Sequence, residues 1–417
     1  MAMKQEAPRV SRWVAAGLLG IVILAPTQYG VEVMKKVHLS PVDPLIGITF
    51  LVWLAGMVRT GAWRAIRAPM AWPILFVALA ALSVVSSTNR LRSASEVVQF
   101  AEYFMAAYLL FVTSLSDRAT FRMVLNVFLA VAGVVILFGL GQYLWPAVAD
   151  FKVRATFNNS HVFGGFLSLV LPLLFGMMLY TEGVWRRLAF LPVILAGLVA
   201  TLSGGTFLAL TLAFGVLAMV RGWKCFASVM AIFFLLVFLA MPLLPRHNLD
   251  VLKNSISLFN EEGDLSRRYI EWQAATEMVQ EHPLLGVGAG GYQDKIGTFY
   301  GILPVVGGTA APADSQNLYL VLAGSIGLPG LAAFLALLGF GAAGAAKGFL
   351  GRDGLEASRK GLYLGIIGSL LAFSVNSFWS PLLVRGVGIP LVIILALATA
   401  RPGYIRSATR SPTSVVE

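Results

Sequence analysis

Apolar residues occur along this chain in long blocks that short polar or basic segments separate. Stretches such as 226–244 and 362–378 contain too few polar groups to form a water-facing surface. A helix of about 20 apolar residues crosses the ~30 Å hydrocarbon core of a bilayer and satisfies its own backbone hydrogen bonds. The pattern therefore predicts an all-α polytopic membrane protein.

Twelve such blocks predict twelve transmembrane helices. Gly and Ser at Leu202–Gly205 interrupt one long apolar run, which we interpret as a turn between two helices. The predicted spans are 13–30, 41–58, 71–88, 97–115, 123–145, 160–181, 188–202, 204–221, 225–244, 316–343, 361–379 and 386–400. The chain then divides into an N-terminal segment (1–12), helices one to nine (13–244), a large loop (245–315), helices ten to twelve (316–400) and a C-terminal tail (401–417).

Positive charge predicts the orientation of these helices. With a cytoplasmic N-terminus, 19 of the 31 Lys and Arg residues fall on the cytoplasmic side. Five of the other 12 belong to the loop 245–315, and long loops count little in the positive-inside rule. Both termini are therefore expected in the cytoplasm, with the loop outside it. This bias also accounts for the net charge of +11, so no nucleic-acid partner is predicted.

The loop 245–315 is the one large polar segment, and it holds nine of the 20 acidic residues. Long loops between otherwise short connections are usually functional. Within it, the apolar spacing of Ser266–Glu281 predicts an amphipathic helix that stops at Pro283. A glycine-rich turn over 284–291 follows, and the Pro/Gly/Ala-rich stretch 301–312 is expected to form a lid or linker.

Several outer-side cations could bind a phosphate group. Arginine suits this role because its guanidinium binds phosphate oxygens bidentately. Arg267, Arg268 and Arg154 are the candidates, although each could instead anchor the chain to lipid headgroups. His161 is a further possible site residue, and His282 could be a site residue or a polar group at a helix end.

Other polar residues are expected to have structural roles. Arg90 and Arg92 are expected to lie in a loop, with their charges solvated. Glu102, inside the fourth span, would be costly in lipid and is expected to pair with an arginine. The four histidines are scattered, no carboxylate pair has ligand spacing, and Cys225 is the single cysteine, so neither a metal site nor a disulfide is predicted.

Four segments resemble the O-antigen ligase and O-antigen polymerase superfamily over about residues 150–345. The segments are Ser266–Trp272 with Glu281–Gly288, Asn317–Leu320 with Gly324–Gly330, Arg154–Asn158 leading to Pro172, and Thr201–Ser203. The resemblance implies an integral membrane glycosyltransferase at the outer face of the bacterial inner membrane. No cofactor is predicted. It further implies a glycan donor on undecaprenyl diphosphate and a lipid A core or a growing glycan as acceptor.

The chain departs from the family pattern at two positions. Gly204 stands where family ligases carry an arginine that is a proposed diphosphate contact, and Gln316 stands where they carry a histidine that activates the acceptor. Glutamine can orient a hydroxyl group but cannot take its proton near neutral pH. Asp314 is the nearest carboxylate and becomes the candidate base, with Gln316 and Asn317 as polar contacts; Glu271 and His282 are less favoured.

Two other functions remain open from sequence. A secondary transporter often has twelve helices, but it would show repeated halves and polar residues at mid-membrane. We find no such repeat, and the polar residues gather at the outer boundary. The missing histidine and arginine also leave a catalytically inert scaffold of envelope polysaccharide assembly possible.

Overall fold

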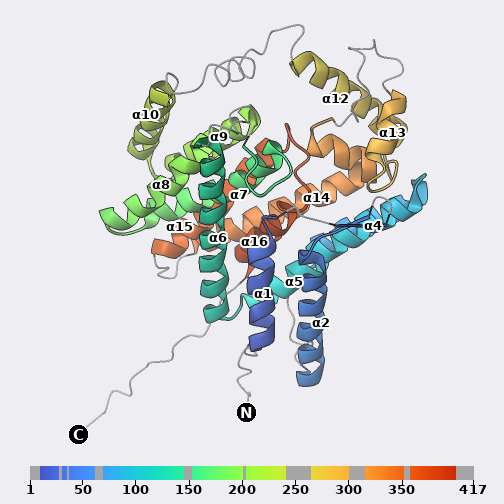
Figure 1. Ribbon diagram of the computed structural model, residues 1–417, viewed down its shortest axis with the longest axis horizontal. Helices are drawn as coiled ribbons and strands as arrows, with labels where there is room; N and C mark the ends of the chain where they lie inside the picture. Colours follow the sequence, from blue (N-terminus) through green and yellow to red (C-terminus); the bar gives the residue numbers. More distant parts are fainter. Residues whose placement is uncertain are drawn as a thin grey trace.

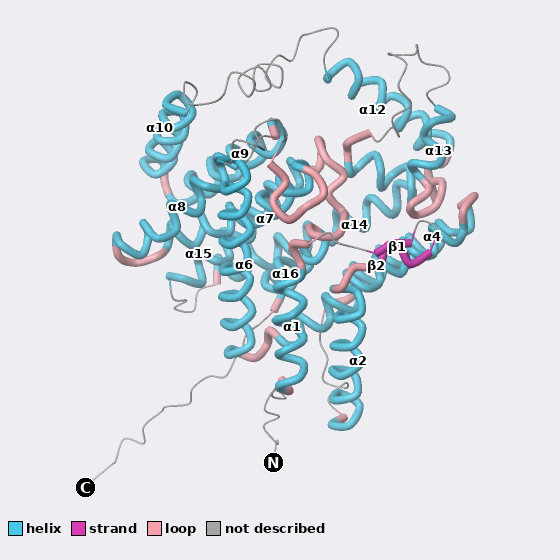
Figure 2. Tube along the Cα trace, in the orientation of Figure 1, coloured by secondary structure: helices cyan, strands magenta, loops and turns pink. Residues whose placement is uncertain are grey.

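A computed structural model shows a helical bundle with one short β-hairpin (Figures 1 and 2). The structure describes residues 10–27, 31–34, 37–61, 69–144, 153–200, 203–240, 264–299, 315–351 and 357–400.

The first half of the chain contributes helices on both sides of the bundle and one helix, α7, at its centre. Its elements are α1 (Arg12–Leu24), β1 (Val31–Met34), β2 (Val37–Leu39), α2 (Val42–Thr60), α3 (Ala71–Ser83), η2 (Val84–Ser86), α4 (Arg90–Phe100), η3 (Ala101–Ala107), α5 (Tyr108–Ser114), α6 (Arg118–Leu144), α7 (Ser160–Tyr180) and α8 (Val184–Ala200). The segment η3 is a π-helical stretch that joins α4 and α5 into one continuous helix.

The second half adds two more bundle helices, a cap and the last three bundle helices. Its elements are α9 (Gly204–Arg221), α10 (Trp223–Ala240), α12 (Asp264–Glu281), α13 (Tyr292–Phe299), α14 (Leu318–Leu350), α15 (Ala357–Asn376) and α16 (Gly388–Thr399). The cap is formed by α12 and α13, which lie together at the top of the molecule in Figure 1.

Each of the twelve predicted spans coincides with a helix. The break at Leu202–Gly205 also separates two helices, because α8 ends before it and α9 begins at Gly204. Within the described residues, six helices are long and apolar enough to cross a membrane, and further apolar helices are shorter. The protein is therefore an all-α membrane protein, while the number of twelve crossings stays a prediction.

Side-chain caps fix where three of the helices begin. Oδ1 of Asn89, Asn159 and Asn317 each accepts a backbone N–H in the first turn of the helix that follows, at 2.8–3.2 Å. A capping asparagine satisfies an amide that has no partner within the helix. These caps define the starts of α4, α7 and α14.

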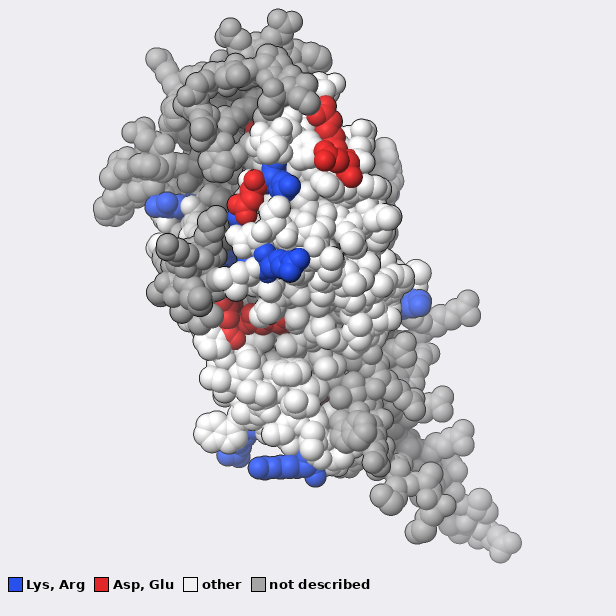
Figure 3. Space-filling model, turned by 90° about the vertical axis from the view of Figure 1, so that its right-hand side faces the viewer, with Lys and Arg blue, Asp and Glu red and all other residues white. Residues whose placement is uncertain are grey.

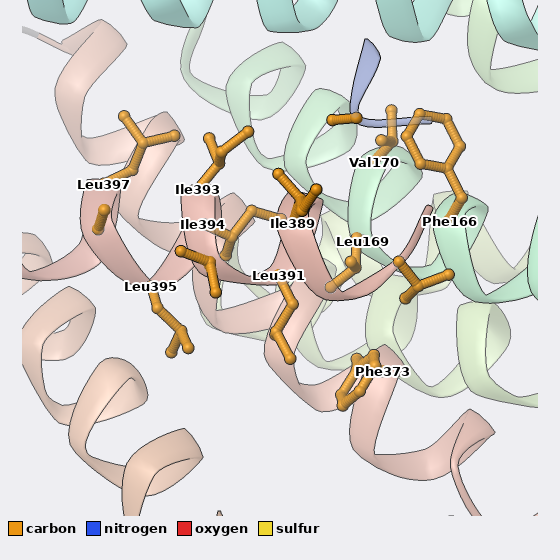
Figure 4. Packing of buried hydrophobic residues seen from close by; sticks show 14 of the residues in the cluster. Phe166, Leu169, Val170, Phe373, Ile389, Leu391, Ile393, Ile394, Leu395 and Leu397 are labelled. Carbon is orange, nitrogen blue, oxygen red and sulfur yellow. The ribbon is translucent and has the colours of Figure 1, made fainter. Parts of the chain in front are cut away.

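The centre of the bundle is formed by α7, α15 and α16 (Figure 4). Nearly all of α16 is buried, as expected for a helix that is apolar on every side. The helices α7 and α15 come so close that a Cβ on Gly365 would lie 2.6 Å from the carbonyl oxygen of Leu173. Gly176 faces the backbone of Gly365 from the other helix. Small residues here permit direct backbone contact between the helices.

Charge is distributed unevenly on the face that carries α13, α4 and α2 (Figure 3). In this view acidic side chains lie toward the top and middle, whereas the lower end of the described surface shows Lys and Arg only. A broad uncharged surface lies between the two ends, as expected for a face in contact with lipid. The orientation of the chain in the membrane stays a prediction.

The structure corrects three sequence interpretations. The hairpin β1–β2 was not expected, because the short connection between the first two predicted spans, residues 31–40, was expected to be a loop. The helix α13 was also missed, since it has only eight residues. Arg90 and Arg92 do not lie in a solvated loop: they begin α4, and Arg92 forms an ion pair with Asp294 of α13. The stretch 301–312, expected as a lid or linker, lies outside the described residues.

The cap is joined to α14 at a break in that helix. Gly327 has φ +78°, and the backbone of Leu284 packs directly against it. The carbonyl of Gly324 accepts the N–H of Val287 at 2.8 Å, and the N–H of Leu328 donates to the carbonyl of Pro283 at 2.8 Å. The glycine-rich turn after α12 therefore replaces a helical hydrogen bond that α14 lacks.

Candidate active site

The helix α12, expected over Ser266–Glu281, begins at Asp264 and holds Arg268 beside the segment that joins α15 to α16. Nη1 of Arg268 donates to the carbonyl oxygen of Trp379 at 3.5 Å. Trp379 packs in turn on the first turn of α9, where a Cβ on Gly205 would lie 2.8 Å from its Cβ. Through Trp379, α12 is thus linked to the α15–α16 segment and to α9, which are distant in sequence. The Trp379 carbonyl helps to orient the guanidinium group.

Gln316 lies between residues whose backbones are fixed by neighbouring segments. Nε1 of Trp272 donates to the carbonyl of Ser315 at 3.0 Å, and the N–H of Leu318 donates to the carbonyl of Ser377 at 2.8 Å. Gln316 itself has φ +49°, in the left-handed region that non-glycine residues use sparingly. Such a conformation costs on the order of 1–3 kcal/mol and persists where the surroundings impose it.

A buried polar network lies next to this segment, and the sequence interpretation missed it. Nδ2 of Asn376 donates to Oγ of Ser168 at 3.0 Å and to Oγ1 of Thr206 at 3.1 Å. The network ties the end of α15 to α7 and α9, immediately before the turn that carries Trp379. An asparagine at the end of an apolar span was the available signal, because polar groups at membrane depth need partners.

The candidate residues therefore fall into three groups. Arg268 and the Gln316–Asn317 segment meet the same turn, residues 377–379. Arg154 is exposed, on a segment whose neighbouring residues Val153 and Ala155 are buried and whose backbone is fixed from α6: Oε1 of Gln142 accepts the N–H of Ala155 at 2.9 Å. His161 is half-buried in the first turn of α7.

His282 is remote from Arg268, although both belong to the loop. Fourteen residues of helix separate them, which corresponds to ~21 Å at 1.5 Å per residue. The His282 ring lies 3.7 Å from the carboxylate of Glu281, at the partly exposed end of α12. The structure thus places this histidine at a helix end. Asp314 and the side chain of Arg267 lie outside the described residues.

A second polar cluster surrounds Arg385 in the same α15–α16 segment. Nη2 of Arg385 contacts Oδ2 of Asp43 at 2.9 Å, and that oxygen also accepts the N–H of Ser40 at 2.8 Å. The charges of Asp43 and Arg385 both act on the carboxyl group of Glu102, which lies in the π-helical stretch η3. Arg385 is thus within electrostatic reach of Glu102, for which the sequence predicts an arginine partner. The sequence interpretation did not identify Asp43.

The arrangement can stabilise an anion at the end of the bundle. It presents an oriented guanidinium group, a glutamine with a constrained backbone and several backbone donors at one boundary of the helices. Among the described residues, no group of three or more His, Cys, Asp or Glu side chains is placed to hold a metal ion. The absence of a metal site from the whole chain stays a prediction.

Comparison with known families gives one match. Residues 188–335 match the family model described as O-antigen ligase. The matched region begins in α8 and ends within α14, so it contains Arg268, Gln316 and Asn317. Arg154, His161 and the Trp379–Arg385 segment lie outside it. A comparison with curated proteins gives no match.

Proposed function

Because the chain belongs to the O-antigen ligase and polymerase superfamily, we propose that it is an integral membrane glycosyltransferase of cell-surface polysaccharide assembly. The proposed donor is a glycan on undecaprenyl diphosphate. The proposed acceptor is a lipid A core, as in a ligase, or another growing glycan, as in a polymerase. The reaction takes place on the periplasmic face of the inner membrane, with both termini in the cytoplasm.

The proposed reaction needs charge stabilisation at the leaving group. An acceptor hydroxyl oxygen forms a bond to the anomeric carbon from the face opposite the diphosphate, which inverts that centre. The bond between the anomeric carbon and the diphosphate oxygen breaks, and undecaprenyl diphosphate leaves. A cation fixed at the membrane boundary stabilises the charge that grows on the diphosphate.

The position of Arg268 is the observation that carries the proposal. Its guanidinium group lies where α12 meets the α15–α16 segment, inside the region that matches the ligase family. The hydrogen bond to the Trp379 carbonyl helps to fix the direction of the Arg268 guanidinium group. Transport would instead call for polar groups at mid-membrane. The cluster at the outer ends of the helices therefore favours glycosyl transfer.

The proton of the acceptor hydroxyl needs a base that Gln316 cannot supply. Gln316 is suited to orient the acceptor, because its backbone is constrained between Ser315 and Leu318. We assign the base to Asp314, two residues earlier in the chain. Glu271 is the alternative: its side chain is buried and lies one helical turn beyond Arg268.

The Arg268 assignment can be tested with purified protein in lipid nanodiscs, an undecaprenyl-diphosphate glycan and an acceptor. We expect Arg268→Ala to lower turnover by ~10²–10³, the usual loss for one transition-state donor. Arg268→Lys should recover little activity, because the bidentate fork is lost. Arg90→Ala is the matched control, because it removes an arginine from the same predicted side of the membrane. This variant should keep wild-type turnover. Wild-type turnover in Arg268→Ala would remove this residue from the site.

A further inference from the structure

A cavity of about 810 Å³ opens between the ends of α7 and α9 and the starts of α8 and α10. Its lining includes three cationic side chains, Arg187, Arg221 and Lys224. Apolar side chains such as Leu188 and Leu191 form the rest of its wall. Charged groups beside an apolar wall are suited to a ligand that has both an anionic and an apolar part.

The positive charge of the cavity is not neutralised within the described part of the chain. Nε of Arg187 donates to the carbonyl of Thr181 at 2.6 Å, which is an uncharged acceptor. The guanidinium group of Arg221 lies 4.9 Å from the centre of the Tyr180 ring, also an uncharged partner. No acidic residue lines the cavity among the described residues. Two of the cations are therefore oriented while their charges remain available.

The cavity lies at the opposite membrane boundary from Arg268. Gly205 in the first turn of α9 packs on Trp379, whereas Arg221 at the last turn lines the cavity. The 18 residues of α9 span ~27 Å, close to the ~30 Å thickness of the hydrocarbon core. Arg221 thus lies at headgroup depth, on the side that the charge bias predicts to be cytoplasmic. The cavity is not part of the glycosyl-transfer site.

We propose that this cavity binds an anionic glycerophospholipid of the inner leaflet. The three cations contact the headgroup phosphate, and the acyl chains run along the wall formed by Leu188 and Leu191. Basic pockets between transmembrane helices on the cytoplasmic side bind lipids of this type. The inference does not depend on the proposed glycosyl transfer, because it rests on a different end of the helices.

Cys225 provides a direct probe, because it lines the cavity and is the single cysteine of the chain. In nanodiscs of phosphatidylcholine alone, a small maleimide should alkylate Cys225 at a measurable rate. Adding phosphatidylglycerol or cardiolipin should slow this alkylation several-fold. Inorganic phosphate and glycerol phosphate should not slow it, because neither has an apolar part. Equal rates with and without anionic lipid would overturn the proposal.

Substitution of the cations provides an independent measurement by native mass spectrometry. Arg187→Gln, Arg221→Gln and Lys224→Gln combined should weaken cardiolipin binding on the order of 100-fold, since each cation contributes about fivefold. The control combines Arg59→Gln, Arg122→Gln and Lys347→Gln, which removes the same charge from exposed positions on the same predicted side but outside the cavity. Equal loss of lipid from both proteins would show nonspecific attraction and refute the site.

Discussion

The contact between α7 and α15 differs in kind from the contact between α12 and the α15–α16 segment. The first is made by backbone against backbone, with Gly176 and Gly365 facing each other, and by apolar side chains around them. The second is made by single polar bonds such as the one from Arg268 to Trp379, and the irregular backbone of Gln316 lies beside the same turn. The first contact runs along the length of α15, and the second lies just beyond the end of the same helix.

The close-packed contact mainly stabilises the fold, whereas the polar contact positions groups that could take part in the reaction. Close packing of α7 on α15 leaves no room for a substrate, but it fixes where α15 ends. The polar contacts at that end contribute less to stability, and they present groups whose directions are defined. Substitutions in the first region should therefore affect folding, whereas substitutions in the second should affect turnover in a protein that still folds.

The largest effect is expected from Gly365→Val. The new Cβ would lie 2.6 Å from the Leu173 carbonyl oxygen and 2.8 Å from its Cα, so the two helices would have to separate. We expect no monodisperse folded protein by size-exclusion chromatography. Gly339→Val adds the same side chain at a glycine of α14 whose Cβ would meet nothing within 4 Å, and it should fold. A folded Gly365→Val protein with a normal melting temperature would contradict the close-packing argument.

A large effect on turnover alone is expected at the proposed base. A general base typically contributes ~10²–10⁴-fold, so Asp314→Asn should slow transfer within that range. Gln316→Ala should cost less, and Gln316→His should be tolerated. Glu271→Gln should be measured in parallel. If the base lies on α12, this variant will lose turnover instead of Asp314→Asn. Normal turnover of Asp314→Asn together with an inactive Gln316→Ala would reverse the two roles.

An intermediate effect on stability is expected from the ion pair that joins α2 to the α15–α16 segment. Asp43 and Arg385 are mostly buried, and Asp43→Ala removes the carboxylate that contacts the arginine, at a cost of ~3–5 kcal/mol. Asp43→Ala combined with Arg385→Met should cost less than the single change. Arg92→Ala breaks a more exposed pair and should cost roughly 1 kcal/mol or less. Thermal unfolding in detergent measures all three, and equal losses would contradict the role of burial.

The smallest effect is expected from Trp272→Phe. This change keeps an aromatic ring but removes the Nε1–H that donates to the Ser315 carbonyl, a bond worth about 1 kcal/mol. The melting temperature should fall slightly. Turnover should fall more than stability does, because the backbone next to Gln316 is less constrained. An unchanged turnover with a lowered melting temperature would assign this tryptophan to stability alone.

The helices of the bundle could be predicted because lipid leaves few alternatives for an apolar chain. Each predicted span coincides with a helix, and α12 follows from its own amphipathic spacing. The family could also be identified from ordered short segments. These features depend on residues that are close together in the sequence.

The features that sequence did not predict join residues from distant parts of the chain. Asp43 and Arg385 lie near opposite ends of the sequence, and Arg268 meets Trp379 more than 100 residues later. Nothing local to Trp379 indicates that its carbonyl will accept a bond from α12. The network of Asn376 with Ser168 and Thr206 was missed for the same reason, because its members come from three different helices.

The break in α14 limits how this protein can change during evolution. The amide of Leu328 and the carbonyl of Gly324 find their partners in Pro283 and Val287, and so neither segment is complete alone. At membrane depth an unsatisfied backbone group costs several kcal/mol. The loop between α10 and α14 is therefore not an interchangeable module: a relative with another specificity can donate its loop only together with the first half of the following helix. We expect recombination boundaries within the family to lie outside residues 282–328.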